Sequence, residues 1–327
     1  MNAAPGTPTG RVIHTGQGVV DLVMRIPEMP GLGGDVFATG HQFLPGGGVN
    51  VMVAAARDGA EVLYVGGHGT GPFGDLVREA LRAEGVALLA PIDPDTDTGF
   101  SVALVEDSTE RTFVSTTGAE AHGSADQLHR AAAVPGDVVY VSGYSLVHEQ
   151  NRRALLDWLP TLPAQCQVVV DPAPVIGEVG LEDIEVLLQR ADVWTTNDRE
   201  AWILLERLTL EAMPQDGPES LAAALCARTS RQIVMRAGSD GAYLARPGEP
   251  VLAVPAPAVD AVDTNGAGDA HAGVMCARLA AGEGLLGAAR RAGVAAALAV
   301  TRHGPATAPT AAETDASMRG APRPGGM

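Results

Sequence analysis

The residues best suited to chemistry lie in the stretch 263–270, which reads Asp-Thr-Asn-Gly-Ala-Gly-Asp-Ala. A helix is expected to begin here, and amides at a helix N-terminus carry the positive end of the helix dipole. The amides of Gly266, Ala267 and Gly268 could therefore hold an anion whose charge grows during a reaction. Asp269 lies beside them, where a carboxylate can take a proton from a hydroxyl nucleophile. The same pattern also fits a plain glycine turn whose aspartate stabilises the first helical turn.

Residues 46–50 form a second glycine turn, in which Gly46 and Gly47 would open the backbone to a ligand. Asn50 can both donate and accept hydrogen bonds, which suits a sugar hydroxyl. Asp21 is the only charged residue between positions 18 and 24 and could bind a second hydroxyl. The alternatives are a helix cap for Asn50 and the solvent face of an edge strand for Asp21.

Residues 197–200 read Asn-Asp-Arg-Glu and follow a short apolar run. Asparagine at a helix cap with glutamate three residues later is an ordinary capping box. The functional alternative is that Glu200 faces the hydration shell of Mg²⁺, because Mg²⁺ keeps its waters and needs few protein carboxylates.

A rival site lies at Gly69–Gly74, which matches the GxGxxG pattern of dinucleotide-binding loops and has Asp93 and Asp95 downstream. Pro72 counts against it, because proline removes an amide that a pyrophosphate would use. The histidines and cysteines form no zinc-binding pattern, and there is no GxSxG nucleophile motif.

The chain has 327 residues, enough for one or two domains, and 46% of them are apolar, which predicts a folded core. Its formal net charge is −17, and all 22 basic residues are arginine. The absence of lysine excludes a Walker P-loop, a pyridoxal phosphate Schiff base, a class I aldolase and a protein-kinase fold. An acidic chain without a basic stripe predicts a small-molecule partner and no nucleic acid.

The longest apolar run is Val294–Val300, far shorter than the ~18 residues of a membrane helix, so no membrane partner is expected. The first residues lack the basic and apolar pattern of a leader. Cys166, Cys226 and Cys276 are widely spaced, which suits a reducing compartment. These features predict a cytoplasmic protein.

Apolar strands alternate with helices along most of the chain, the pattern of an α/β protein with a mostly parallel sheet. Strands are expected at Glu61–Gly66, Val86–Ala90, Asp137–Ser142, Gln167–Val170, Val193–Thr196, Ile233–Met235 and Tyr243–Ala245. Helices are expected at Val51–Asp58, Phe73–Glu84, Asn151–Leu159, Asn197–Leu208 and Gly268–Ala281.

Two segments, Val19–Phe43 and Gly99–Ser115, instead alternate like half-exposed antiparallel strands and predict a small inserted sheet, here called the lid. They hold four of the five phenylalanines, so the lid either covers a ligand or meets another subunit, unless it is a plain hairpin over the core. The predicted boundaries are 11–20, 46–96 and 120–314 for the main domain, 21–45 and 97–119 for the lid, and 1–10 and 315–327 for loose ends.

Taken in order, these segments resemble the ribokinase-like, PfkB-type sugar and nucleoside kinases from about Arg11 to Thr310. Residues 263–270 resemble that family's C-terminal signature, and Gly46–Gly71 its N-terminal one. The other similar segments are Thr98–Ser101 and Glu110–Phe113 in the lid, the turn Asp171–Pro174, Asn197–Glu200, the nucleotide loop Arg236–Gly241 and a strand near adenine at Val300–Arg302. The resemblance implies a three-layer α/β/α fold with an inserted antiparallel lid.

The resemblance also implies ATP-dependent phosphorylation of an alcohol, with ATP and Mg²⁺ as cofactors. Asp269 would deprotonate the acceptor hydroxyl, while the amides of residues 266–268 stabilise the transferring phosphoryl group. The resemblance implies sugar binding by Asp21, Gly46, Gly47 and Asn50. It implies contact with ATP by Asn197, Arg236, Gly238, Gly241 and Gly293. It also implies Mg²⁺ bound through water at Glu200 and Asn197, and K⁺ bound at Asp263.

Departures from the family pattern bear on the substrate. Where ribokinase carries asparagine before the sugar-binding aspartate and lysine in the glycine turn, this chain has Val19 and Gly47. The turn offers no basic side chain for an existing phosphate, although Arg25 or Arg111 could reach one from the lid. We therefore expect an unphosphorylated ribose- or fructose-like sugar, a related polyol or a nucleoside. His271 replaces the family's usual phenylalanine, and a packing role on the helix face is expected rather than a chemical one. Because relatives often pair through the lid, a homodimer is expected.

Two functions of other classes stay open on the sequence. One is an NAD-dependent dehydrogenase that binds its cofactor through Gly69–Gly74. The other is a non-catalytic sugar- or nucleotide-binding regulator, since a fold alone does not prove activity. The presence of Asp269, Asn197 and Glu200 speaks against the regulator.

Overall fold

The main body of the protein is built on a nine-stranded sheet with the order β15-β14-β13-β12-β11-β10-β1-β4-β6. The computed structural model describes residues 10–108, 111–209, 214 and 217–320. Neighbouring strands are parallel except where β14 pairs with β13 and β15. In sheet order the strands span Leu252–Val254, Ala242–Ala245, Gln232–Arg236, Val193–Asn197, Gln167–Asp171, Val138–Ser142, Val12–His14, Val62–Tyr64 and Ala87–Leu88. The expected mostly parallel sheet is confirmed.

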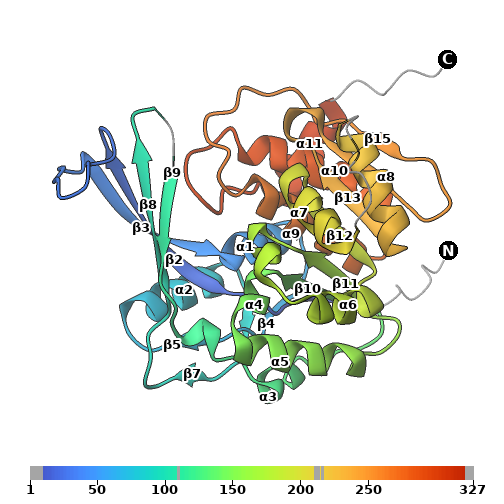
Figure 1. The fold of residues 1–327 in the computed structure, drawn as a ribbon, viewed down its shortest axis with the longest axis horizontal. Helices are drawn as coiled ribbons and strands as arrows, with labels where there is room; N and C mark the ends of the chain where they lie inside the picture. Colours follow the sequence, from blue (N-terminus) through green and yellow to red (C-terminus); the bar gives the residue numbers. More distant parts are fainter. Residues whose placement is uncertain (1–9, 109–110, 210–213, 215–216, 321–327) are drawn as a thin grey trace, which may run out of the picture.

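Helices cover both faces of this sheet (Figure 1). The alternation of side chains along a strand explains the three layers: Val138 and Tyr140 of β10 enter one core, and Val139 and Val141 enter the other. The first face packs against α1 (Gly48–Arg57), α2 (Pro72–Ala83), α9 (Ala267–Ala280) and α10 (Leu285–Ala299). The second packs against α3 (Ala125–His129), α5 (Glu149–Trp158), α6 (Leu181–Arg190), α7 (Asp198–Leu208) and α8 (Pro218–Thr229).

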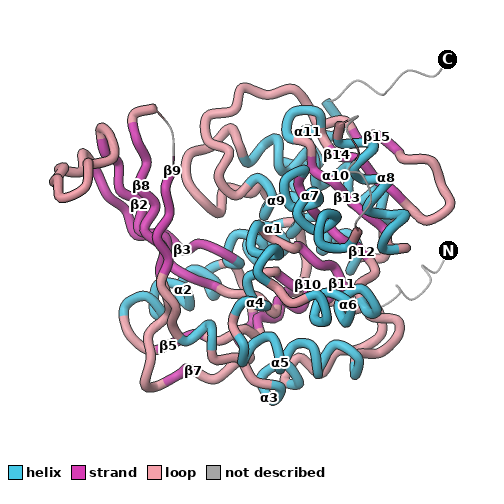
Figure 2. Tube along the Cα trace, viewed as in Figure 1, coloured by secondary structure: helices cyan, strands magenta, loops and turns pink. Residues whose placement is uncertain are grey.

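The lid is a separate four-stranded sheet that projects from one side of the main body (Figures 1 and 2). Its strands in order are β3 (Gly40–Gly47), β2 (Gly18–Ile26), β8 (Phe100–Glu106) and β9 (Arg111–Ser115). The outer pairs are antiparallel as expected, but the central pair of β2 and β8 is parallel, which corrects the all-antiparallel expectation. The reason is that two hairpins from distant parts of the chain join side by side. Glu110 of the predicted lid motif lies outside the described residues.

The phenylalanines of the lid divide into two groups. Phe43 and Phe100 pack around Phe73 of α2, with ring centroids 5.9 and 5.0 Å from it. Phe37 and Phe113 are 87% and 56% exposed. The first pair therefore joins the lid to the main body, and the second leaves apolar surface on the lid.

Two expectations near the C-terminus are wrong. Residues Val300–Arg302 form a turn after α10, not a strand, because the amides of Thr301 and Arg302 donate to carbonyls of the preceding helical residues. The end predicted to be loose from residue 315 instead begins inside α11 (Ala311–Gly320), where Asp315 pairs with Arg291 of α10. Residues 1–9 and 321–327 of the predicted loose ends lie outside the described part.

The remaining elements are short. β5 (His68–Gly69) and β7 (Ile92–Asp93) pair in parallel as a third, two-stranded sheet. The others are α4 (Tyr144–Val147) and the 3₁₀ turns η1 (Ala119–Ala121), η2 (Leu159–Thr161), η3 (Pro174–Glu178) and η4 (Gly238–Asp240). Among the described helices, none combines the length and the apolar character that crossing a membrane requires.

Candidate active site

Polar side chains gather at the carboxyl ends of three neighbouring parallel strands. Asp171 ends β11, Asn197 ends β12 and Arg236 ends β13. Because parallel strands end at the same edge of a sheet, these residues meet although they lie far apart in the sequence. Ligand sites of open α/β sheets form at this edge.

The first turn of α9 lies over the same edge. Gly266, its N-cap, has a φ of +74°, a left-handed conformation that favours glycine, and it has no side chain that could cap the first turn. Of the three amides predicted for the anion hole, that of Ala267 donates to Thr264 O at 3.3 Å, so it would exchange this hydrogen bond for one to an anion. The predicted anion hole therefore lies at a helix N-terminus whose N-cap residue supplies no side-chain acceptor.

Asp269 faces the glycine turn at the start of α1. Asn50 donates from Nδ2 to Asp269 Oδ2 at 2.9 Å. Burial raises the pKa of Asp269 to about 6, and the hydrogen bond from Asn50 opposes the rise. Asp269 is thus mostly ionised near neutral pH but poised to accept a proton.

Asp21 completes this group from the lid strand β2. A Cβ on Gly46 would lie 2.2 Å from Asp21 Oδ2, so only glycine lets the carboxylate lie against the backbone there. Burial raises the pKa of Asp21 to about 6, and the negative charge of Asp269 adds to the rise. The fold therefore brings together Asp21, Gly46, Asn50 and Asp269, four residues that the sequence predicted for one site.

Arg236 lies beneath the first turn of α9, where a Cβ on Gly268 would be 3.6 Å from its Cζ. It donates to Asp171 Oδ2 at 2.8 Å, to Thr195 Oγ1 at 3.1 Å and to Glu200 Oε2 at 3.1 Å. Its side chain is only 13% exposed. In this structure Arg236 thus acts as a counter-ion for two carboxylates, a role that the sequence did not predict.

Asn197 and Glu200 form the capping box that was the plain alternative. Glu200 N donates to Asn197 Oδ1 at 2.8 Å, and Asn197 N donates to Glu200 Oε2 at 2.9 Å. Glu200 also faces the charge cluster, because burial and the Asp171 carboxylate raise its pKa. The capping role and a place at the site are therefore compatible.

The chain matches the PfkB family carbohydrate kinase model over residues 29–312. It belongs to the PfkB family of carbohydrate kinases. It is 30% identical over 308 residues to the uncharacterized sugar kinase YegV of Escherichia coli strain K12, with 92% of each chain covered. It is 28% identical over 291 residues to ribokinase of Bacillus subtilis strain 168, covering 87% of this chain and 91% of that protein.

The fold matches solved structures of the same family. The structure of Arabidopsis thaliana ribokinase, complexed with ribose and ATP, has a TM-score of 0.76 to this chain at 22% identity, and the match covers 96% of this chain and 100% of the other. The ribokinase-like fold, with its large mostly parallel sheet and small separate sheet, is thereby confirmed.

The rival loop at Gly69–Gly74 is occupied by the kinase's own Asp97. The amides of Phe73 and Gly74, at the start of α2, donate to Asp97 Oδ2 at 3.2 Å and Oδ1 at 2.8 Å. A pyrophosphate would need these amides. Together with the family match, this contact makes the dehydrogenase interpretation wrong.

The predicted nucleotide residues lie near Arg236 or on α10. Gly238 and Gly241 have φ values of +57° and +93° in the turn after β13. A Cβ on Gly241 would lie 2.1 Å from Val254 O, so close packing against β15 also requires a glycine at this position. Gly293 lies in α10 with open space beside its Cα.

Asp263, the predicted K⁺ residue, joins two loops of the kinase. It accepts from Asn265 N at 2.9 Å and from Gly304 N at 3.1 Å. In the described part of the chain, no group of three or more His, Cys, Asp or Glu is arranged to hold a metal ion directly.

Three residues near the site were missed or left unexplained by the sequence. Asp171 was noted only as part of a turn, although a carboxylate directly after an apolar strand could have marked it. Tyr144 begins α4 and is 46% exposed, and the carboxylates of Glu200 and Asp269 add to the effect of burial in raising its pKa. His271 is 4% exposed, and burial lowers its pKa to about 3, so it is a neutral side chain packed in the core.

Proposed function

We propose that this kinase transfers the γ-phosphate of ATP to a hydroxyl of an unphosphorylated sugar or related polyol, with Asp269 as the base. The observation that carries the proposal is the meeting of Asp21, Asn50 and Asp269 beside the first turn of α9. Asp21 and Asn50 would bind acceptor hydroxyls on one side of Asp269, and the helix amides would bind the phosphate on the other.

The chemistry follows from this placement. Asp269 takes the proton of the attacking hydroxyl, and a pKa of about 6 suits a base that acts near neutral pH. The amides of residues 266–268 stabilise the negative charge on the transferring phosphoryl group. Phosphoryl transfer needs positioning and charge stabilisation more than covalent chemistry, so a kinase without lysine is physically reasonable.

Mg²⁺ would accompany ATP, and the donor set here suits a hydrated ion. Glu200 and Asp171 place two carboxylates at the strand ends, but Arg236 shares an oxygen of each. Such groups fit an ion that keeps its waters and is held mainly by phosphates. When bound, Mg²⁺ would neutralise phosphate charge, and Glu200 with Asn197 would reach it through water.

The acceptor class is inferred from charge. Asp21 and Asp269 are both acidic, and the glycine turn 46–50 carries no basic side chain. A phosphorylated acceptor would bring a further negative charge beside these carboxylates, which disfavours its binding. Arabidopsis ribokinase, whose structure contains ribose and ATP, supports a pentose as the first acceptor to test.

A nucleoside is the alternative acceptor, and the position of Tyr144 supports this alternative. This exposed aromatic side chain lies near the carboxylates of the site. Its ring could stack on a nucleobase or on the face of a sugar. The two acceptor classes are distinguished by turnover alone.

The decisive experiment measures ADP release from Mg-ATP in K⁺ buffer against pentoses, hexoses, polyols and nucleosides. Wild type should show acceptor-dependent turnover, and Asp269→Asn should lower it by about 10²–10⁴-fold. Asp260→Asn is the matched control, because Asp260 is exposed in the loop before α9. If Asp269→Asn keeps more than about a tenth of the turnover, Asp269 is not the base.

A result without turnover would also be informative. If wild type binds ATP in a thermal-shift assay but phosphorylates none of these acceptors, a panel of sugar phosphates follows. Absence of turnover there as well would favour the non-catalytic regulator.

We further propose that the lid pairs two subunits. Leu32, Phe37, Phe113 and Val114 leave apolar side chains exposed on the lid, and such a surface is costly for a monomer. Light scattering should give twice the mass of the chain, and Phe37→Ser with Phe113→Ser should halve it. A monomeric mass of the wild-type protein across micromolar concentrations would overturn this proposal.

K⁺ activation through Asp263 is a separate proposal. Asp263 ties the loop before α9 to the loop after α10, so an ion there would shape the anion hole. Turnover should be higher in Na⁺-free K⁺ buffer than in a bulky organic cation. Equal rates would count against it.

A further inference from the structure

The lid joins the main body at four backbone crossings, and each has a glycine. Gly18 begins β2, Gly47 ends β3 and is followed by Gly48 of α1, Gly99 precedes β8, and Gly118 follows β9. Gly18 N donates to Tyr64 Oη at 3.0 Å, and Gly48 N donates to Gln17 O at 2.6 Å. These first two crossings are thus held by uncharged groups.

One buried carboxylate holds the other two crossings. Glu120, in the short turn η1, is 3% exposed. Its Oε2 accepts from Gly99 N at 2.7 Å, and its Oε1 accepts from Gly118 N at 2.8 Å. Because one rigid carboxylate binds both amides, the start of β8 and the end of β9 are fixed to each other.

The glycines are needed for this approach. A Cβ on Gly99 would lie 2.3 Å from Glu120 Oε1, and a Cβ on Gly118 would lie 2.4 Å from Gly99 N. The link extends to a third lid strand, because Val20 N of β2 donates to Gly99 O at 3.2 Å. Glu120 therefore lies where most of the lid meets the main body.

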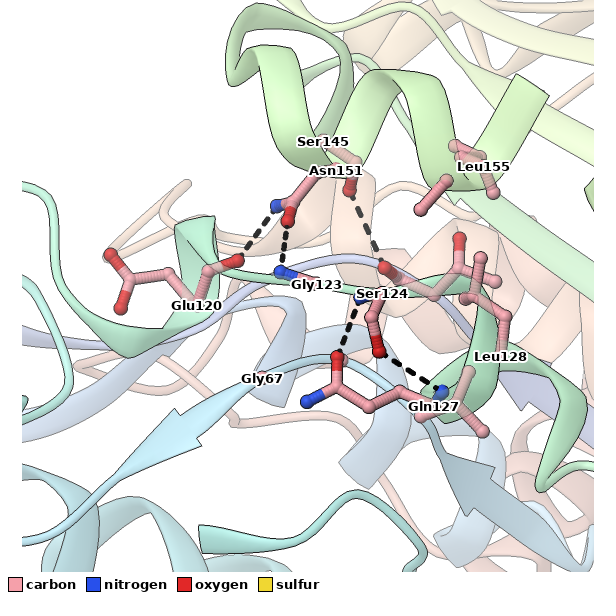
Figure 3. Close-up of a pocket in the computed structure, with 13 residues that line it drawn as sticks. Gly67, Glu120, Gly123, Ser124, Gln127, Leu128, Ser145, Asn151 and Leu155 are labelled. Carbon is pink, nitrogen blue, oxygen red and sulfur yellow. Dashed lines mark hydrogen bonds between the residues drawn. The ribbon is translucent and has the colours of Figure 1, made fainter. Parts of the chain in front are cut away.

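A residue of the main body binds the backbone of Glu120, as Figure 3 shows. Asn151 of α5 donates from Nδ2 to Glu120 O at 2.7 Å and accepts from Gly123 N at 2.5 Å. In Figure 3 the Glu120 carboxylate points away from Asn151. These residues border a cavity of about 20 Å³, room for about one water. Glu120 thus connects a helix of the main body to the lid.

We propose that Glu120 is a positioning residue that sets the angle of the lid over the acceptor site. This inference rests on the proposed function, in which the lid closes over the acceptor. If Glu120 is lost, fewer molecules hold the lid in the binding-competent position. The apparent affinity for the acceptor then falls by that fraction, while ATP, bound on the main body, is affected less.

Glu120→Gln tests this role. The amide has one acceptor oxygen, so its NH₂ group faces one of the two glycine amides and leaves it without a partner. We expect the acceptor KM to rise about tenfold while the KM for ATP stays within about twofold. Hydrogen exchange in peptides covering residues 97–101 and 116–121 should speed up by a similar factor.

Asp137→Asn is the matched control. Asp137 is fully buried and, besides its ion pair with the Arg11 side chain, accepts from two backbone amides, Arg11 N at 2.9 Å and Val134 N at 2.9 Å. It lies directly before β10, away from the lid. Asp137→Asn should lower the melting temperature without changing the ratio of the KM for the acceptor to the KM for ATP. If Asp137→Asn shifts the acceptor KM as much as Glu120→Gln does, Glu120 has only a structural role.

Asn151→Ala keeps the proposal testable if Glu120→Gln does not fold. It removes the support behind Glu120 but leaves the carboxylate, so a smaller change in the same direction is expected. Unchanged exchange at both peptides in the Glu120 variant, or equal changes in the two KM values, would overturn the proposal. The exchange readout needs no activity, so it stands apart from a failure of the proposed kinase reaction.

Discussion

Asn50 and Asp269 lie 219 positions apart in the chain, and a 2.9 Å hydrogen bond between their side chains joins the first turns of α1 and α9. Both helices pack on the same face of the main sheet, and each begins at a glycine turn. In the proposed reaction, this hydrogen bond therefore connects α1, whose first turn binds the acceptor, to α9, whose amides bind the phosphoryl group.

The pH dependence of turnover should reflect this contact. With a pKa of about 6, Asp269 is protonated as the pH falls below that value, so turnover should fall on the acid side. Asn50 lowers the pKa of Asp269, and Asn50→Ala should move the acid limb of the pH–rate profile to higher pH. An acid limb at the same pH in the variant would show that the titrating group is not Asp269.

The buried carboxylates should cost stability at neutral pH. Burial raises the pKa of Asp21 from 3.8 to about 6. Its contribution to folding is therefore fully present below about pH 4 and is lost as the pH rises through about 6. Asp21→Asn should raise the melting temperature at pH 7 by about 2–4 °C and change it little at pH 4. Calorimetry at the two pH values checks this, and equal shifts at both would contradict it.

Gly46→Ala should damage acceptor binding through Asp21. The new Cβ would lie 2.2 Å from Asp21 Oδ2 and push the carboxylate aside. Loss of such a charged hydrogen-bond partner predicts an acceptor KM about tenfold higher, with a small effect on the KM for ATP. Gly40→Ala is the control, because a Cβ at Gly40, on the same strand β3, meets nothing within 4 Å. Similar kinetics for the two variants would remove Asp21 from the acceptor site.

Arg236→Met should strongly destabilise the main body. It leaves the buried carboxylates of Asp171 and Glu200 without their counter-ion, which costs about 3–5 kcal/mol. Arg246→Met is the matched control, because the pair of Arg246 with Glu249 is more exposed and contributes less than about 1 kcal/mol. Denaturant unfolding measures both.

The kinetics of Arg236→Lys distinguish two roles for Arg236. If Arg236 mainly holds Glu200 in place, kcat should fall and the Mg²⁺ concentration needed for half-maximal turnover should rise. The KM for ATP should then change little. A rise confined to the KM for ATP would instead support the direct contact with ATP that the family resemblance implies.

Local sequence patterns were enough for the elements and for the central motif. The strands β10 to β13 and the helices α2, α7 and α9 lie within a few residues of their expected positions, because alternating apolar strands and helix-start signals are local. The stretch 263–270 was recognisable for the same reason, since the glycines and Asp269 that form it are adjacent in the chain.

Two predictions near the C-terminus failed, one at a local turn and one at a tertiary ion pair. The family resemblance implied a strand at 300–302, but α10 continues to Ala299 and the chain then closes in a turn, in which Thr301 N and Arg302 N donate to Leu298 O and Ala299 O. The end from residue 315 was predicted loose from its composition, yet Arg291 pairs with Asp315 and α11 runs to Gly320. Composition does not report such tertiary partners.

The sequence by itself determined the α/β class, the glycine turns that begin α1 and α9, and the residue types of Asp269, Asn50 and Asp21. Only the tertiary structure decided that Arg236 is the counter-ion of Asp171 and Glu200 and that Glu120 joins Gly99 to Gly118. The physical reason is that ion pairing, burial and the resulting pKa shifts depend on which strand ends and crossings lie side by side. That arrangement follows from the order of strands in the sheets, which no local pattern of residues encodes.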